Sequence, residues 1–193
     1  MTTSAHGDNQ RLEQDPLTQL PVDFTAFFTS RQHTYLKWAQ QLLRNRHDAE
    51  DAVQNAGIIL YRKWDLALSH ANYEAFAFKI VRDAVYDLRR ARHRIARINT
   101  AAANNARINA GSDQLHRQKD YDLLDRAMET LSRTDPLQAD CLRLQSTGQT
   151  GEGIATMLGI TPGSARVLLT RGRHTVQQLL TSYRADERSE DRT

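Results

Sequence analysis

The chain has 193 residues and a formal net charge of only +3, so its composition neither requires nor excludes nucleic acid as a partner. Its single cysteine, Cys141, excludes an intramolecular disulfide and a cysteine-based zinc site. The first twenty residues lack the basic start and apolar run of a secretory signal, and no stretch reaches the roughly 18 apolar residues of a membrane span. We therefore expect a cytoplasmic protein without membrane insertion.

The N-terminal part of the chain predicts a polar tail followed by three helices. Residues 1–21 are polar and show no sustained apolar period, as in a disordered tail. Asp23 is placed to cap the first helix, and a second helix starts near Asp48 with apolar residues at helical spacing. Turn-forming residues at 65–72 predict a loop, and a third helix is expected over about 73–94.

A change in composition separates this part from the rest of the chain. The sequence TAAANNARINAGS at 100–112 is small and polar and has no large apolar face, which indicates a flexible or partly helical linker. We place the linker at 98–119, between a first domain at 22–97 and a second domain at 120–183.

Four helices are expected in the second domain, before a polar tail at 184–193. They cover about 121–132, a segment opening with Asp135-Pro136, about 151–158 with Gly159 as the stop signal, and a segment from Thr161-Pro162 to about 183. No run alternates apolar and polar residues for long enough to indicate a sheet. The predicted fold class is therefore all-α, with two small helical domains, the second a four-helix domain.

The last two predicted helices match a helix-turn-helix, in which the second helix enters the DNA major groove. At about 100° per residue, the final helix places its apolar residues on one side and an arginine–threonine face on the other. With Ser164 near its start, that face comprises Ser164, Arg166, Val167, Thr170, Arg171, Arg173 and His174. Arginine pairs with guanine edges and phosphates. The alternative is a solvated basic helix that closes a bundle, but the caps, the turn glycine and the helix lengths favour DNA binding.

The third predicted helix carries a second basic face. Phe78, Arg82, Tyr86 and Arg89 fall in one sector beside its apolar face, and six arginines lie from Arg82 to Arg97. Aromatic rings stack on unpaired bases while arginines hold phosphates, so this sector suits single-stranded DNA. Packing against the core is the competing interpretation of the aromatic rings, and the pattern alone does not decide between the two.

Acidic residues crowd the start of the second predicted helix, where Asp48, Glu50 and Asp51 precede Gln54. Carboxylates at a helix N-terminus interact favourably with its dipole, which explains these residues without any partner. The same residues also form a polar face for a basic protein surface, and the charge pattern alone favours neither interpretation.

Three segments together resemble the extracytoplasmic-function sigma factors of the sigma-70 family. HDAEDAVQNAGIILYRKW at 47–64 is similar to the core-binding helix of that family, whose form is close to D-A-E-D-L-V-Q-E-x-F. AFAFKIVRDAVYDLRRARHR at 75–94 is similar to the promoter-melting helix that follows it. Residues 124–173 resemble the domain that reads the −35 promoter element. The resemblance covers about 24–94 and 121–180, with matching order and spacing.

The resemblance implies a transcription initiation factor that binds core RNA polymerase and promoter DNA, without enzymatic activity or a cofactor. The residues expected to face the polymerase β′ clamp helices are Asp48, Glu50, Asp51 and Gln54. The residues expected at the melted −10 element are Asn72, Phe78, Arg82, Asp83, Tyr86, Arg89 and Arg90. The face of the final helix would read the −35 duplex, and the β flap is a further expected polymerase contact. The family also suggests control by an anti-sigma factor.

The chain departs from the family pattern at several positions. Asn55 and Ala56 replace the usual acidic residue and its neighbour, and Asp83 stands where an asparagine is usual. Gly153 stands where a glutamate usually precedes Ile154. These changes indicate a divergent member of the family and leave its −10 preference open.

Two other classes of function compete with this interpretation. A helix-turn-helix regulator with an N-terminal sensing domain explains the second domain, but not the acidic helix followed by the aromatic and basic helix. An enzyme is disfavoured because the histidines show no paired metal-ligand spacing and no glycine-rich phosphate loop is present. We therefore expect neither a catalytic site nor a metal site.

Overall fold

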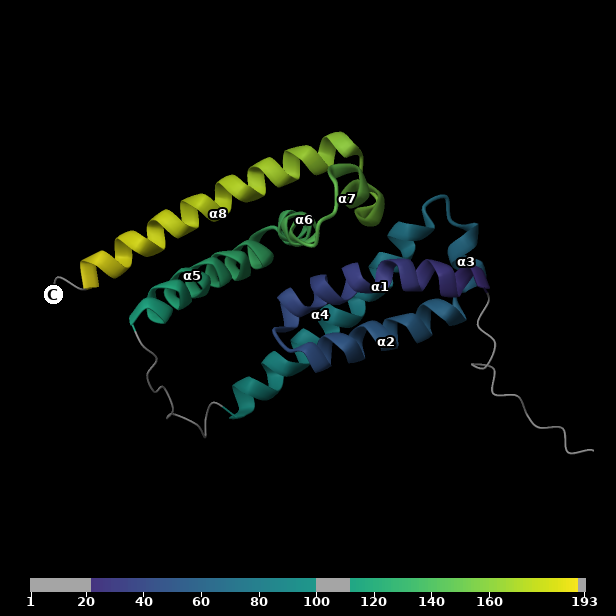
Figure 1. Cartoon of the computed structure of the whole chain (residues 1–193), viewed down its shortest axis with the longest axis horizontal. Coiled ribbons are helices and arrows are strands. Elements are labelled where there is room, and N and C mark those ends of the chain that lie inside the picture. Colours follow the sequence, from purple (N-terminus) through teal and green to yellow (C-terminus); the bar gives the residue numbers. More distant parts are fainter. Residues whose placement is uncertain (1–21, 100–111, 191–193) are drawn as a thin grey trace, which may run out of the picture.

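The computed structural model describes residues 22–99 and 112–190, and within these ranges the chain forms eight helices and no strand (Figure 1). In chain order the helices are α1 (Val22–Leu43), α2 (Arg46–Arg62), α3 (Trp64–Ser69), α4 (Tyr73–Asn99), α5 (Ser112–Thr134), α6 (Pro136–Ser146), α7 (Gly151–Leu158) and α8 (Pro162–Glu190). The all-α prediction is confirmed. No helix in the described ranges is both long and apolar enough to cross a membrane.

The N-terminal domain is built around α2, which packs along both α1 and α4. Its buried residues recur at helical spacing: Ala49, Ala52, Val53, Ala56, Gly57 and Leu60. At one end of the domain, Trp64 packs edge-on against Phe24 and donates from Nε1 to Asp23 Oδ2 at 2.9 Å. The prediction that Asp23 caps α1 is wrong, because α1 already begins at Val22 and Asp23 binds Trp64 instead.

The segment predicted as a loop at 65–72 is largely helical. Helix α3 buries Trp64 and Ala67, which are three residues apart and therefore share one face. Only the end of the segment turns, where Asn72 Oδ1 accepts a hydrogen bond from the Ala75 amide at 3.0 Å and so caps α4. The exposed side of α3 carries Asp65 and Ser69 together with the apolar Leu66 and Leu68.

The starts of α6 and α8 and the end of α7 in the C-terminal domain lie where the sequence predicts. Asp135 accepts a hydrogen bond from the Gln138 amide at 3.0 Å, with Pro136 at the start of α6. Gly159 ends α7 in the left-handed conformation, at φ +66°. Thr161 Oγ1 then accepts from the Ser164 amide at 3.1 Å at the start of α8. The short α7, the glycine turn and the long α8 form the predicted helix-turn-helix.

Several helices are longer than predicted. Helix α4 continues to Asn99 and α5 begins at Ser112, so both ends of the segment assigned to the linker are helical. Helix α8 passes residue 183 and reaches Glu190, and its Tyr183 lies under the Arg126 guanidinium and bonds Thr130 Oγ1 at 2.9 Å. This contact with α5 gives the end of α8 a packing partner. The predicted tail at 1–21, the middle of the linker and residues 191–193 lie outside the described residues.

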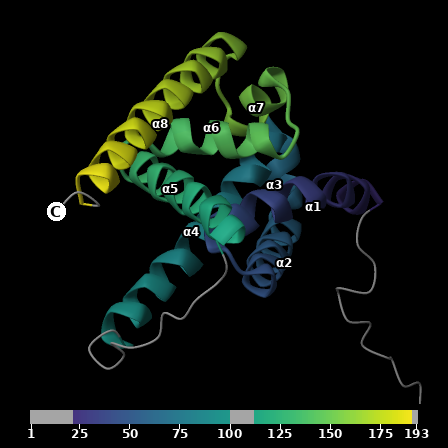
Figure 2. The same ribbon diagram turned by 60° about the vertical axis from the view of Figure 1, so that its left-hand side comes forward.

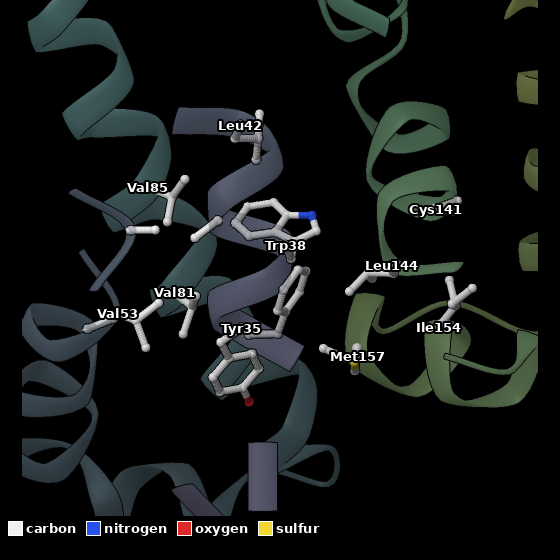
Figure 3. Close-up of a cluster of buried hydrophobic side chains, with 14 of the residues drawn as sticks. Tyr35, Trp38, Leu42, Val53, Val81, Val85, Cys141, Leu144, Ile154 and Met157 are labelled. Atoms are coloured by element: carbon white, nitrogen blue, oxygen red, sulfur yellow. The ribbon is translucent and has the colours of Figure 1, made fainter. Parts of the chain in front are cut away.

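The two domains share one hydrophobic core. Helix α7 packs against α4, and α6 packs against α1 (Figure 2). One buried cluster contains Tyr35 and Trp38 of α1 together with Leu144 of α6 and Met157 of α7 (Figure 3). A separate cluster around Leu131 holds α5, α6 and α8 together. The sequence predicts two domains on a linker, but it does not predict that they pack against one another.

Candidate nucleic-acid interface

Helix α8 presents an open basic face. Arg166, Val167, Thr170 and Arg171 are all exposed, and we call them the recognition face. Val167 keeps 46% of its surface in solvent, a high value for a branched apolar side chain. The opposite side of the helix is buried, with Ala165, Leu169, Gly172 and Val176 facing the domain interior. The angular sorting of this helix from sequence is therefore confirmed in the structure.

The remaining candidates on α8 border the recognition face. Ser164 is exposed, and its hydroxyl lies 2.9 Å from that of Thr161, at the first turn of the helix. Arg173 is exposed and donates from Nη2 to Gln145 Oε1 at 2.9 Å, which orients its guanidinium beside α6. His174 is exposed one turn after Thr170. All seven residues predicted for duplex contact are thus accessible on α8.

The basic and aromatic sector of α4 lies in different surroundings. We call Arg82, Tyr86 and Arg89 the α4 strip. The Tyr86 hydroxyl donates to Asp140 Oδ1 of α6 at 3.0 Å, and Arg82 Nη1 lies 3.9 Å from Oδ2 of the same carboxylate. Arg89 forms an ion pair with Glu129 of α5. Each member of the strip therefore contacts an acidic residue of the C-terminal domain.

The other residues predicted for the −10 element are spread over different environments. Phe78 is only 1% exposed and packs against Tyr35 and Trp38, so in this structure it is a core residue and offers no surface for stacking on a base. The packing interpretation is correct at this position, because Phe78 lies next to Ala77 on the inner side of α4.

Three further −10 candidates make polar contacts of their own. Asn72 caps α4 and donates from Nδ2 to the Thr156 carbonyl at 2.9 Å, which ties the helix start to α7. Asp83 is exposed and accepts from Lys79 Nζ at 2.7 Å. Arg90 is exposed and pairs with Asp87 on the same helix. Only Asp83 and Arg90 among these three point to solvent.

The acidic start of α2 divides into inner and outer residues. Asp48 forms an ion pair with Arg92 of α4, and its side chain is only 18% exposed. Glu50 accepts from Arg46 Nε at 2.7 Å within the helix. Asp51 and Gln54 lie fully on the outside. Of the four predicted polymerase contacts, Asp48 therefore serves to join α2 to α4, and the outward surface is formed by the later residues.

An exposed isoleucine extends this outer surface of α2. Ile58 is 40% exposed and follows Gln54 by four residues, so both side chains lie on one face of the helix. A single exposed apolar side chain is ordinary on a protein surface, so Ile58 extends this face without by itself marking a binding site. Helical spacing predicts Ile59 on the apolar side of this helix and leaves Ile58 outside it, but both are 40% exposed.

The contact between the two domains shifts the ionisation of its buried groups. Burial raises the pKa of Asp140 to about 6, while the Tyr86 hydroxyl and the Arg143 and Arg82 guanidinium groups oppose the shift. Burial raises the pKa of the Tyr86 hydroxyl and lowers that of Arg143. The buried Asp140 carboxylate therefore lies between Arg82 and Tyr86 of the α4 strip and Arg143 of α6.

The described residues hold no cluster of histidine, cysteine, aspartate and glutamate that fits a metal ion. The single cysteine, Cys141, is buried in α6, and burial raises the pKa of its thiol to about 11. A thiol in this state is a poor nucleophile at neutral pH. The chemistry that these surfaces offer is recognition of charged and aromatic partners.

Comparison with known proteins identifies the N-terminal domain. Residues 27–95 match the family model for sigma-70 region 2, which spans α1 to α4. No curated protein sequence matches the chain.

A solved structure resembles the chain more broadly. The sigma factor RpoE of Bartonella quintana, determined in complex with the anti-sigma factor NepR, is 22% identical with a TM-score of 0.52. The match covers 82% of this chain and 97% of that chain, so the fold of both domains is shared. The chain therefore contains a sigma-70 region 2 domain, and its two-domain fold is shared with a solved sigma factor.

Proposed function

We propose that the chain is a sigma factor of the extracytoplasmic-function type, which directs core RNA polymerase to specific promoters by reading the −35 element as duplex with α8. The observation that carries the proposal is the recognition face, on which Arg166, Val167, Thr170 and Arg171 are exposed beside a helix-turn-helix with complete caps. Arginine and threonine side chains on a major-groove helix contact guanine edges, phosphates and thymine methyl groups.

The α4 strip is proposed to hold the melted −10 strand. Tyr86 supplies an aromatic ring and Arg82 and Arg89 supply positive charge, the combination that binds unpaired bases and their phosphates. Asp83 and Arg90 lie exposed nearby on the same helix and belong to this proposed surface. Phe78 is left out of it because it is buried.

The outer face of α2 is proposed to dock on the β′ clamp helices of the polymerase. Asp51 and Gln54 are exposed there, and Ile58 adds an apolar contact on the same side. The C-terminal domain is proposed to bind the β flap. The structural neighbour was solved with an anti-sigma factor, which supports the proposal that such a partner also controls this chain.

Transcription in vitro tests the proposal directly. Purified core polymerase is mixed with the chain and a library of genomic promoter fragments, and the start sites are mapped. Specific initiation with no other sigma factor present is the expected result. Initiation only when a second sigma factor is added would instead indicate a helix-turn-helix regulator. An Arg171→Ala variant should lower specific initiation while leaving polymerase binding intact.

A further inference from the structure

A cleft of about 890 Å³ is lined by residues from the end of α1, the last turns of α4 and one side of α5. We call it the α4–α5 cleft. Helix α4 projects here beyond α1 and α2 (Figures 1 and 2). On α5 the lining residues Asp122, Asp125, Glu129 and Arg133 recur every three or four positions and therefore share one face. The cleft falls within the size range of pockets that hold small organic molecules.

Arginine is the commonest residue in the lining of the α4–α5 cleft. Five arginines line it, and only three carboxylates do. Glu129 pairs with both Arg89 and Arg133, so one carboxylate serves two guanidinium groups. Arginines still outnumber carboxylates when Asp48 of α2, the partner of Arg92, is added. Because each guanidinium has five N–H donors, these ion pairs leave donors and positive charge for an anionic ligand.

The turn after α1 holds one of these arginines in an unusual backbone conformation. Among the described residues, Arg44 is the only one other than glycine with a positive φ, at +53°. Glycine is favoured at such a helix end, because a side chain raises the energy of this conformation. Arg44 Nη1 lies 2.9 Å from Asp125 Oδ2, and 58% of its side chain stays exposed. The turn therefore brings an accessible guanidinium group to α5.

A buried donor lines an adjoining pocket of about 200 Å³. Arg44, Arg89 and Glu129 line both spaces, and Arg143, only 5% exposed, lines the smaller one. Arg143 Nη2 donates to Ser132 Oγ at 2.7 Å, but Nη1 is buried with no hydrogen-bond partner in the part of the chain that the structure describes. A buried N–H group without an acceptor is unfavourable, so an acceptor atom that enters this pocket binds favourably.

Apolar and acidic side chains give the α4–α5 cleft further binding capacity. Leu42 and Leu43 line it at the end of α1, and Ile95 of α4 lines it with 57% of its surface exposed. An inorganic phosphate would leave most of the volume and all of this apolar surface unused. A nucleoside phosphate adds a flat base, which packs on apolar side chains, and hydroxyl and amino groups. The carboxylates of Asp122 and Asp125 can accept hydrogen bonds from such groups.

We propose that the α4–α5 cleft binds a nucleoside polyphosphate. Its phosphate groups contact Arg44 and Arg133, because guanidinium groups form paired hydrogen bonds with phosphate oxygens. Its base lies against Leu42 and Ile95. The site is separate from the recognition face of α8, and its occupancy is measured on the free chain without polymerase or DNA. Failure of this proposal therefore leaves the proposed promoter recognition intact.

Calorimetric titration of the free chain is the direct test. The probes are ATP without metal ions, inorganic triphosphate and adenosine. We expect ATP to bind at one site, triphosphate to bind about tenfold more weakly and adenosine about a hundredfold more weakly. No binding of ATP, or adenosine bound as tightly as ATP, would overturn the proposal. Triphosphate bound as tightly as ATP would overturn the assignment of a nucleoside.

Removal of single arginines tests the position of the phosphate groups. Arg133 keeps 73% of its side chain exposed, so Arg133→Ala should fold normally. Arg133→Ala and Arg44→Ala should each weaken ATP binding about tenfold, as loss of a charged hydrogen bond does. Arg62→Ala makes the same charge change at an exposed residue of α2 that does not line the cleft, and should change the affinity less than about twofold. Thermal unfolding by circular dichroism checks each variant. Equal losses in all three would indicate general attraction to a basic protein and overturn the proposal.

Amide hydrogen exchange locates the bound nucleotide. With ATP present, peptides from 89–95 of α4 and 122–133 of α5 should exchange more slowly, because the ligand joins the two helices. Peptides that contain 166–171 of α8 should be unchanged. Protection confined to α8 would mean that ATP occupies the recognition face in the place of DNA phosphates, and the proposed cleft site would be wrong.

Discussion

The recognition face of α8 and the α4 strip carry the same kinds of residue in opposite surroundings. Both are basic faces beside an apolar helix side, and both can be read from helical periodicity. The first is open to solvent over all of its members, whereas each member of the second contacts a carboxylate of the other domain. An exposed basic face and one paired with carboxylates of another domain should respond differently to mutation and pH.

The largest expected effect is on the free energy of unfolding, and it comes from a substitution in the core next to the α4 strip. Trp38 is fully buried and packs edge-on against Phe78 and Tyr86, next to the interface with α6. Trp38→Ala should lower the free energy of unfolding by about 3–5 kcal/mol, because the cavity cannot be refilled from either domain. Val167→Ala on the open face of α8 should stay within about 0.5 kcal/mol. Urea unfolding followed by circular dichroism measures both. Similar losses for the two variants would remove the contrast between the faces.

The α4 strip should also respond to pH, while the open face should not. Burial raises the pKa of Asp140 to about 6 in the folded chain, against 3.8 for a free carboxyl group, and the opposing groups are Tyr86 and Arg82 of α4, Arg143 of α6 and the indole of Trp38 of α1. The folded chain therefore binds this proton more tightly than the unfolded chain does. This contribution to stability is greatest below about pH 4 and falls by up to roughly 2–3 kcal/mol as the pH rises through 6.

Urea unfolding at several pH values measures this response. The contribution of Asp140 to the free energy of unfolding should be larger at pH 5 than at pH 7.5. Asp140→Asn keeps an oxygen acceptor for the Tyr86 hydroxyl and removes the ionisation, so its free energy of unfolding should change less between pH 5 and pH 7.5 than that of the parent chain. A pH response that persists unchanged in Asp140→Asn would assign the effect to other groups.

Duplex recognition by α8 is the complementary test of the open face. Arg171 is exposed, with no shielding by the N-terminal domain. Arg171→Ala should weaken binding to a −35 duplex by about 1–3 kcal/mol if the guanidinium reads a base, and should leave the free energy of unfolding unchanged. Fluorescence anisotropy with a duplex selected by the holoenzyme measures the loss. An equal loss on every duplex sequence would instead indicate a phosphate contact.

The comparison also shows what the sequence could and could not predict. Caps at Asp135 and Thr161, the stop at Gly159 and the two sides of α8 depend on residues close in sequence, and they are found as predicted. The pairing of the α4 strip depends on residues more than 35 positions away, such as Glu129 for Arg89 and Asp140 for Tyr86. Periodicity identifies a face but not the element that packs on it.

The errors in helix assignment have the same origin. Trp64 and Ala67 are buried against α1 and α4, so α3 forms in a segment whose composition resembles that of a loop. Phe78 falls at the edge of the apolar sector, and only the position of Trp38 decides that it is buried. Tertiary packing outweighs local preference at both places.

The smallest expected effect separates two carboxylates that the sequence placed in one polymerase-binding group. Asp48 is paired with Arg92, so Asp48→Asn should cost about 0.5–1 kcal/mol of unfolding free energy because the arginine is still partly solvated. It should change polymerase affinity little. Asp51 is exposed, so Asp51→Ala should leave stability unchanged and reduce affinity for core polymerase several-fold, as loss of an interface contact does. Binding to a labelled β′ clamp fragment, with urea unfolding of the same samples, measures both. If Asp48→Asn weakens polymerase binding more than Asp51→Ala does, the inner carboxylate also belongs to the docking surface, and the division of α2 into inner and outer residues is wrong.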